Sequence, residues 1–145
     1  MHLAFSPIRS SDLPTSPEIL VHFPGLAVVL ECVHREYFLV RCELDEVAYL
    51  QIESTLDANC LLVYMIFVRS GFRQRGIGSE VMLWAIDYAT GKGYHRLQVR
   101  PVPMSAYLDI DMPVLQAFYY KLGFFDALDY PGILEVILSP NAPQL

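Results

Sequence analysis

One segment organises the rest of the chain: Val68-Arg69-Ser70-Gly71-Phe72-Arg73-Gln74-Arg75-Gly76-Ile77-Gly78-Ser79-Glu80. The residues before it, 60–68, are nearly all apolar, which predicts a central strand covered on both faces. After it, apolar residues recur at helical spacing, which predicts a helix over 76–90. The segment is therefore predicted to be a glycine-containing turn that connects a strand to a helix.

Such a turn presents free backbone N–H groups to a ligand. The first N–H groups of a helix have no partner inside it, and the helix dipole adds positive character, so phosphate binds well there. Gly76 and Gly78 allow a ligand to approach the backbone closely. Arg69, Arg73 and Arg75 place three of the chain's ten basic residues in this short stretch. A phosphate site is predicted; the alternative is an ordinary turn with solvated arginines.

Composition limits the class of protein. A chain of 145 residues with 54% apolar and 18% charged residues is expected to form one globular domain with its own core. The net charge of −6 argues against nucleic acid as a partner of the whole surface. No apolar run reaches the roughly 20 residues of a membrane helix, so no membrane association is expected. The first residues do not resemble a signal peptide, and a cytoplasmic location is expected.

The cysteines Cys32, Cys42 and Cys60 are scattered along the chain. Neither a disulfide framework nor a metal-binding spacing is visible, so we expect reduced, mostly buried thiols and no metal site. The high apolar fraction leaves surface for a ligand or for a second copy of the chain in a homodimer.

The remaining chain predicts alternating elements. Strands are expected over 3–8, 37–42, 47–53, 60–68, 95–102, 124–128 and 133–138, and helices over 18–23, 76–90 and 113–122. The strands 37–42 and 47–53 are joined by four residues, which suggests a hairpin. Residues 26–33 are almost entirely apolar and fit either a strand or a helix. This order of elements predicts an α/β sheet layered with helices.

Two segments resemble motifs of the GNAT superfamily of N-acetyltransferases. Val68-x-Ser70-x-Phe72-Arg73-x-x-Gly76-Ile77-Gly78 resembles the acyl-CoA-binding signature Val-x-Pro-x-Tyr-Arg-x-x-Gly-Ile-Gly, with Ser and Phe in place of Pro and Tyr. Phe118-Tyr119-Tyr120-Lys121-Leu122-Gly123-Phe124 resembles the family's Leu-Tyr-x-Lys-Leu-Gly-Phe segment. The two segments stand in the order expected for the family.

The resemblance implies a GNAT (acyl-CoA N-acyltransferase) fold. In this fold a mixed central sheet splays between its fourth and fifth strands and carries helices on both faces. Residues 1–145 would form a single domain, with a first strand and a variable acceptor-side region over 1–36, a core over 37–138 and a loose tail over 139–145. The resemblance also favours a helix over 26–33.

The resemblance further implies acetyl-CoA as co-substrate. The backbone N–H groups of Gln74 to Ser79 would wrap the pyrophosphate, with arginine side chains adding charge. Ile66 and Val68 would pair with the pantetheine arm like an added strand, and the Val68 N–H would polarise the thioester carbonyl. The complete set implied to bind the co-substrate is Ile66, Phe67, Val68, Arg73, Gln74, Arg75, Gly76, Ile77, Gly78, Ser79 and Tyr119.

Catalytic candidates follow from the same resemblance. Tyr119 takes the position of a tyrosine that protonates the leaving CoA thiolate, and Tyr120 is the spare candidate. Met112 stands where the family often has Asn. For the general base, Glu53 is the best-placed carboxylate and His95 is second, although either residue can equally be an ordinary surface residue.

The expected activity is transfer of an acetyl group from acetyl-CoA to a primary amine by direct attack in a ternary complex. The acceptor would be a small-molecule amine or a peptide or protein amino group. Its pocket is expected between residues 10–35, the hairpin and 104–112, with Tyr49, Tyr64, Tyr107, Asp109 and Asp111 as an aromatic, acidic mouth. The alternative is a catalytically weak or inactive acyl-CoA-binding sensor or interaction module. A toxin that acetylates charged tRNA fits the net charge of −6 poorly.

Overall fold

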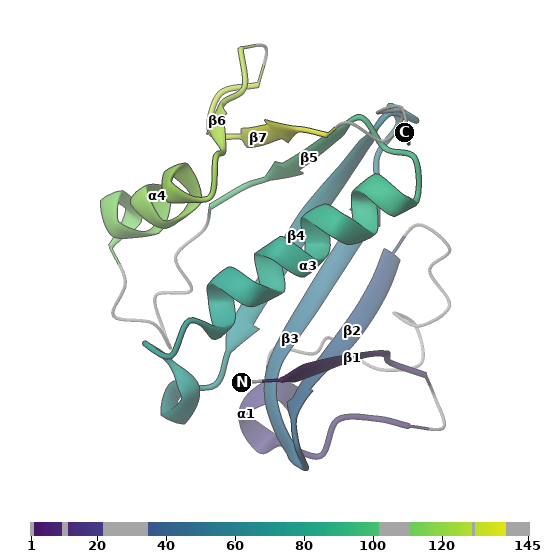
Figure 1. The fold of residues 1–145 in the computed structure, drawn as a ribbon, viewed down its shortest axis with the longest axis vertical. Helices are drawn as coiled ribbons and strands as arrows, with labels where there is room; N and C mark the ends of the chain where they lie inside the picture. The colour runs from purple at the N-terminus through teal and green to yellow at the C-terminus, as the bar shows by residue number, and fades with distance from the viewer. Residues whose placement is uncertain (1, 10–11, 22–34, 102–110, 129, 139–145) are drawn as a thin grey trace.

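The structure is a computed structural model that describes residues 2–9, 12–21, 35–101, 111–128 and 130–138 (Figure 1). In these residues a seven-stranded sheet has the order β1-β2-β3-β4-β5-β7-β6. Its strands are β1 (Leu3–Pro7), β2 (Arg35–Cys42), β3 (Asp45–Ser54), β4 (Cys60–Val68), β5 (Arg96–Val99), β6 (Phe125–Asp126) and β7 (Leu134–Ile137). The helices are α1 (Pro17–Leu20), the short 3-10 helix η1 (Ser70–Phe72), α3 (Ile77–Gly91) and α4 (Met112–Lys121).

Most predicted elements are confirmed, and β4 has the predicted bounds. The hairpin of β2 and β3 is tighter than predicted, because Asp45 already pairs with Cys42. Strand β5 is shorter than predicted, because its pairing with β7 ends at Val99 and Pro101 cannot donate to a ladder. The expected helix over 26–33 and most of the expected loop over 104–112 lie outside the described residues.

The sheet splays between β4 and β5, as expected. β4 pairs antiparallel with β3 along its length, whereas its parallel pairing with β5 ends at Val63 opposite Val99. A bulge lies at the same place: Met65 opposes Gln51 and Val63 opposes Ile52, so Tyr64 has no residue opposite it. Bulges increase the local twist of a strand, which helps to turn the end of β4 away from β5.

Apolar residues bury both faces of the sheet. On one face, α3 lies across the strands (Figure 1). There it packs the side chains Ile77, Val81, Met82, Ala85 and Ala89 against the sheet, and Tyr119 of α4 joins the same core. On the other face, Ile19 of α1 packs with Tyr49 and Phe67. The predicted mixed α/β fold with helices on both faces is confirmed.

The end of β4 is more open than predicted. Cys60, Leu61 and Val63 are buried, but Tyr64 is 52% exposed and Ile66 and Val68 are only partly buried. The prediction that β4 is covered on both faces is therefore wrong from Tyr64 onward. The physical reason is that β5 no longer flanks β4 beyond Val63.

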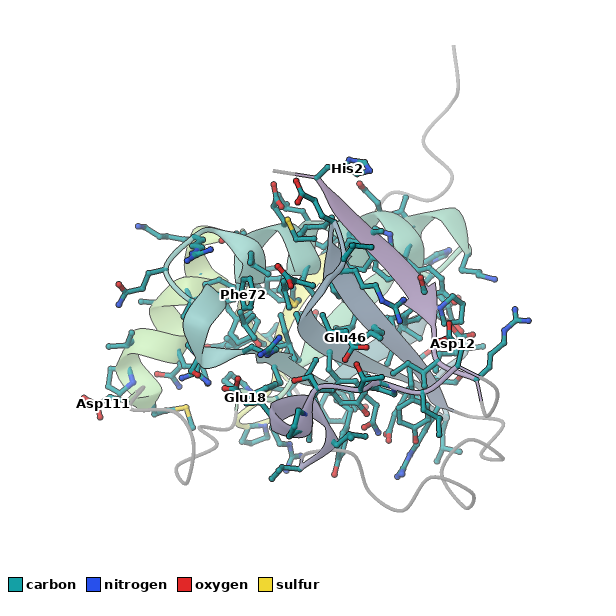
Figure 2. All side chains as sticks on the ribbon, turned by 90° about the horizontal axis from the view of Figure 1, so that it is seen from below. His2, Asp12, Glu18, Glu46, Phe72 and Asp111 are labelled. Carbon is teal, nitrogen blue, oxygen red and sulfur yellow. The ribbon has the colours of Figure 1, made fainter. Side chains whose placement is uncertain are left out.

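Helix α1 is fixed to the sheet by buried and half-buried carboxylates (Figure 2). Glu46 of β3 accepts hydrogen bonds from the backbone N–H of Thr15 at 2.8 Å and of Ser16 at 2.7 Å. Glu18 of α1 accepts from the Ser70 N–H at 2.8 Å. Although burial alone would raise the pKa of Glu18, the N–H of Ser70 and the Arg69 guanidinium hold that pKa below its usual value. These contacts join α1 to β3 and to the turn that follows β4.

No helix among the described residues combines the length and apolar character that a membrane span requires.

Candidate active site

The turn into α3 leaves backbone donors without helical partners. Gln74 and Gly76 both have left-handed backbones, with φ of 62° and 79°. Gly76 is the N-cap of α3, and no side chain of the described residues caps the helix. The Glu80 N–H donates to the Gly76 carbonyl at 3.1 Å. The N–H groups of the first turn before Glu80 therefore lie at the positive end of the helix dipole, where an anion is stabilised.

The end of β4 directs its alternate backbone groups into the splay. The Arg69 N–H donates to the Val47 carbonyl at 2.9 Å, so these two residues form a hydrogen-bonded antiparallel pair. In such a ladder, hydrogen-bonded and non-bonded pairs alternate. Val68, opposite Ala48, and Ile66 therefore occupy non-bonded pairs, with N–H and C=O turned away from β3.

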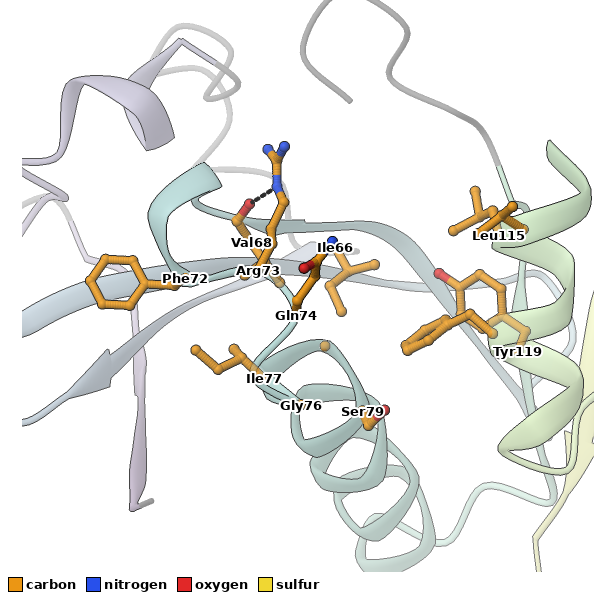
Figure 3. A pocket seen from close by; sticks show the side chains of 13 residues that line it. Ile66, Val68, Phe72, Arg73, Gln74, Gly76, Ile77, Ser79, Leu115 and Tyr119 are labelled. Carbon is orange, nitrogen blue, oxygen red and sulfur yellow. Dashed lines mark hydrogen bonds between the residues drawn. The ribbon is translucent and has the colours of Figure 1, made fainter. Parts of the chain in front are cut away.

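A cavity of about 500 Å³ joins these two features (Figure 3). It lies where the end of β4, the start of α3 and one face of α4 meet. Its lining residues are Ile66, Val68, Phe72, Arg73, Gln74, Gly76, Ile77, Gly78, Ser79, Val114, Leu115, Phe118 and Tyr119. We call it the first cavity.

Three of the residues implied to bind acetyl-CoA are placed differently from the others. Phe67 is 1% exposed and packs in the core on the opposite face of the sheet, so it does not line the first cavity. Arg75 does not line it either, and its guanidinium lies 5.4 Å from the centre of the Phe72 ring. Arg73 does line the cavity, but its Nε donates to the Val68 carbonyl at 3.0 Å (Figure 3). That bond fixes the turn to the end of β4.

Several lining residues have no site role that local sequence patterns predict. Leu115 and Phe118 have the i, i+3 spacing that puts side chains on one helix face, and this pattern was interpreted only as part of a helix. A Cβ atom on Gly78 would lie 3.5 Å from Phe118 Cζ, so α4 packs close to the first turn of α3. Phe72 was noted only as the replacement for a tyrosine.

A second cavity of about 520 Å³ lies on the other side of the splay. Its lining residues are Glu53, Leu62, Val63, Tyr64, Met65, Ile66, Val99, Arg100, Leu115, Tyr119 and Ile133. It shares Ile66, Leu115 and Tyr119 with the first cavity. The two cavities therefore meet at the open edge of β4.

Comparisons with known proteins agree with this geometry. The family model described as "Acetyltransferase (GNAT) family" matches residues 10–124. The chain belongs to the GNAT acetyltransferase family. None of the curated proteins compared with this GNAT chain matches it.

Solved structures of GNAT proteins share the fold of this chain. A GNAT family acetyltransferase from Elizabethkingia anophelis with acetyl-CoA bound has a TM-score of 0.71 at 16% identity, covering 94% of this chain and 98% of its own. The IAA acetyltransferase from Bacillus cereus has a TM-score of 0.67 at 18% identity, and the match covers 94% of this chain and 100% of its own. The ribosomal-protein-S18-alanine N-acetyltransferase from Escherichia coli has 0.62 at 18%, covering 99% of each chain. At these identities the likeness concerns the fold alone.

Tyr119 of this GNAT domain lies where the two cavities meet. Its side chain is 2% exposed, and its hydroxyl is directed toward Ile66 (Figure 3). Burial raises the pKa of Tyr119, so the hydroxyl keeps its proton at neutral pH. Tyr120, the spare candidate, is 45% exposed, lines neither cavity and donates to Asp126 Oδ1 at 2.7 Å.

Glu53 lines the second cavity and is held by its neighbours. Its Oε1 lies 2.5 Å from Arg35 Nε and accepts from Gln51 Nε2 at 3.4 Å. Gln51 in turn accepts from the Tyr49 hydroxyl at 3.0 Å. The guanidinium of Arg35 also lies 5.6 Å from the centre of the Tyr64 ring. This row of side chains fixes the Glu53 carboxylate at the cavity wall.

Other residues considered from the sequence lie elsewhere. His95 precedes β5 at the end opposite Val99 and lines neither cavity. Tyr49 is fully buried in the core, and Asp111 is an exposed N-cap of α4, so neither lines the expected acceptor mouth. Tyr107 and Asp109 lie outside the described residues.

Two of the three cysteines lie in the described residues. Cys60 is buried, as expected, whereas Cys42 is only partly buried; Cys32 lies outside the described residues. Among the residues described, no group of three or more His, Cys, Asp or Glu side chains could hold a metal ion.

The residues present fit acyl-CoA. The unpartnered N–H groups at the start of α3 suit phosphate oxygens, because they combine directed donors with the positive helix end. The backbone edge of Ile66 and Val68 suits an arm that contains amides, because such an arm can pair with it as an added strand. Tyr119 lies farther along the same cavity.

Proposed function

We propose that this GNAT protein transfers an acetyl group from acetyl-CoA to a primary amine by direct attack. One observation carries the proposal. A single cavity joins the free N–H groups at the start of α3 to the open backbone edge of β4 and to the buried hydroxyl of Tyr119. The Elizabethkingia anophelis protein that shares this fold has acetyl-CoA bound.

Backbone groups would bind the co-substrate. The N–H groups of Ile77, Gly78 and Ser79 would bind the phosphates, and those of Ile66 and Val68 would bind the pantetheine amides and the carbonyl oxygen. When bound, acetyl-CoA supplies an acyl thioester that an amine can attack. The Val68 N–H would stabilise negative charge that develops on the carbonyl oxygen, as an oxyanion-hole donor does.

Two side chains would move protons. Tyr119 keeps its hydroxyl proton at neutral pH and would donate it to the leaving sulfur, which otherwise departs as a thiolate. Glu53 lines the second cavity, where the acceptor would bind, and would remove a proton from the incoming ammonium directly or through one water. Tyr119 belongs to both cavities and Glu53 only to the second, so a reaction at the edge that the cavities share lies beside the acid and opens toward the base.

Binding and turnover should be measured on the same preparation. Calorimetry with acetyl-CoA and CoA measures binding, and release of the CoA thiol in the presence of a panel of primary amines measures transfer. We expect binding together with amine-dependent thiol release. Binding without thiol release for any amine would favour the alternative, an acyl-CoA-binding sensor. No binding would refute both.

The pair of neighbouring tyrosines provides a matched test. Tyr119→Phe removes only the hydroxyl and should lower kcat on the order of 100-fold or more, the usual contribution of a positioned acid, with unchanged CoA affinity. Tyr120→Phe makes the same chemical change outside both cavities and should keep wild-type turnover. Equal kcat for wild type and Tyr119→Phe would remove Tyr119 from the acid role.

A further inference from the structure

The second cavity has few charged groups. Among the described residues that line it, only Glu53 and Arg100 carry formal charge. The rest of the wall is apolar or aromatic: Leu62, Val63, Tyr64, Met65, Ile66, Val99, Leu115, Tyr119 and Ile133. A cavity with such walls suits a ligand with an apolar body that is oriented by one or two polar groups.

The two charged groups are not equivalent. The Glu53 carboxylate is already balanced by Arg35, whose Nε lies 2.5 Å from Glu53 Oε1. Arg100 is exposed to the cavity mouth and, within the described part of the chain, makes no ion pair and no side-chain hydrogen bond. The described wall therefore presents one uncompensated positive charge.

Strand geometry places this charge across β4 from Glu53. Glu53 of β3 pairs with Leu62, and Leu62 pairs with Gln98 of β5, two residues before Arg100. Two strand spacings of about 4.8 Å separate β3 from β5 at this level. The carboxylate on β3 and the guanidinium of the residue that follows β5 therefore reach the same cavity from opposite sides of β4.

We propose that the acceptor is an amino acid with an apolar side chain, and that Arg100 binds its carboxylate. This inference rests on the acetyl transfer proposed above. The guanidinium forms two parallel hydrogen bonds with a carboxylate, which fixes the orientation of the ligand as well as holding it. The apolar wall takes the side chain, and the amino group is left to face the edge that both cavities share.

The same charges disfavour a polyamine. A polyamine carries several ammonium groups and would require several free carboxylates, whereas the described wall has one carboxylate that is already paired with Arg35. Arg100 would repel such an acceptor, and repulsion of the wrong ligand contributes to specificity as much as attraction of the right one.

The experiment compares acceptors that differ by one group. CoA-thiol release is measured with L-phenylalanine, L-leucine, L-methionine, L-phenylalaninamide and spermidine. L-Phenylalaninamide keeps the amine and the ring but lacks the carboxylate. We expect at least one of the three amino acids to be a better acceptor than the amide or spermidine, with a ratio of kcat/KM on the order of 10- to 100-fold, the value of one charge-assisted contact.

Variants then assign the effect to one side chain. Arg100→Gln should raise KM for the amino acid by a similar factor and leave KM for acetyl-CoA unchanged. It should also bring the ratio of kcat/KM for the amino acid to kcat/KM for the amide close to one. Arg9→Gln makes the same change at an exposed residue just beyond β1, outside both cavities, and should leave all three quantities unchanged. A merely structural role for Arg100 would lower turnover of every acceptor equally.

The inference is overturned if the amide or spermidine is used as well as the amino acids, or if Arg100→Gln leaves the ratio unchanged. It is also overturned if acetyl-CoA binds and none of the amino acids is acetylated. Failure of acetyl-CoA to bind is a separate result, which refutes the proposed function and the inference with it.

Discussion

Replacing the Glu46 carboxylate, by the substitution Glu46→Gln, should lower the free energy of unfolding more clearly than replacing any other carboxylate of the described residues. It is 8% exposed and accepts from the Ser16 N–H at 2.7 Å, from the Thr15 N–H at 2.8 Å and from the Thr15 hydroxyl at 3.1 Å. These bonds hold the segment that leads into α1 against β3. Glutamine has the same shape, but one of its two terminal atoms is a donor that faces other donors.

The size of the expected stability loss follows from how deeply the groups bonded to Glu46 are buried. A hydrogen bond to a charged group contributes about 1.5–3 kcal/mol, and a buried donor left without a partner costs a similar amount. Ser16 is buried and bears the full cost, whereas Thr15 is exposed and water can replace its acceptor. The partly exposed Arg41, 3.8 Å from Glu46 Oε2, adds little. We therefore expect a loss of about 2–3 kcal/mol in the free energy of unfolding, or about 10 °C in Tm for a domain of this size.

Urea unfolding followed by circular dichroism measures this loss. Asp45→Asn removes the same formal charge from the exposed neighbouring residue and should change the free energy of unfolding by less than about 0.5 kcal/mol. If Glu46→Gln is as stable as Asp45→Asn, the carboxylate does not hold α1 to the sheet and the reasoning is refuted.

Three further substitutions test the turn, the buried thiol and the aromatic core. Gly76→Ala places a side chain on a residue with φ of 79°, so the free energy of unfolding in urea should fall by about 1 kcal/mol and CoA binding by calorimetry should weaken. The control Gly71→Ala, where φ is not positive and no atom lies within 4 Å of the added Cβ, should change neither quantity. Equal effects of the two substitutions would contradict a special role of the Gly76 backbone in the turn. Burial raises the pKa of Cys60 from 9.0 to about 11, so the stability that its protonated thiol contributes is fully present below pH 9 and is lost as pH rises toward 11. The difference in unfolding free energy between wild type and Cys60→Ala should therefore change between pH 9 and pH 11. A difference that stays constant over this range would refute the raised pKa. Phe5→Ala removes the ring that stacks on Trp84 with ring centres 4.3 Å apart, so the free energy of unfolding should fall by about 2–3 kcal/mol. The fluorescence emission of Trp84, the single tryptophan, should shift to the red, and unchanged emission would argue against the stacking.

Local sequence patterns predicted the parts of the site that are built from neighbouring residues. The apolar run of β4, the glycines at 76 and 78 and the amphipathic α3 follow one another along the chain, so their relation does not depend on the rest of the fold. Helical spacing alone also places Leu115 one turn before Tyr119 on the same helix face, although only the structure shows that this face lines a cavity.

Side-chain contacts that depend on how the chain folds back on itself could not be predicted from local spacing. The Nε of Arg73 bonds the Val68 carbonyl, a contact that depends on how the turn folds back on β4. Arg75 lies over the Phe72 ring for the same kind of reason. The environment of Glu53 depends on Arg35, a residue of another strand.

The sequence by itself determined the family, the order of strands and helices, and the anion-binding turn from Val68 to Ser79, because each of these is written in contiguous residues. Only the tertiary structure decided where β4 separates from β5, since that point depends on a bulge at Tyr64 and on pairing that stops at Val63. The second cavity lies at this separation, and Arg100, the residue after β5, reaches it from a segment distant in sequence from Glu53. β4 and β5 are joined through α3 and not by a tight turn, so no local turn geometry fixes where their pairing stops.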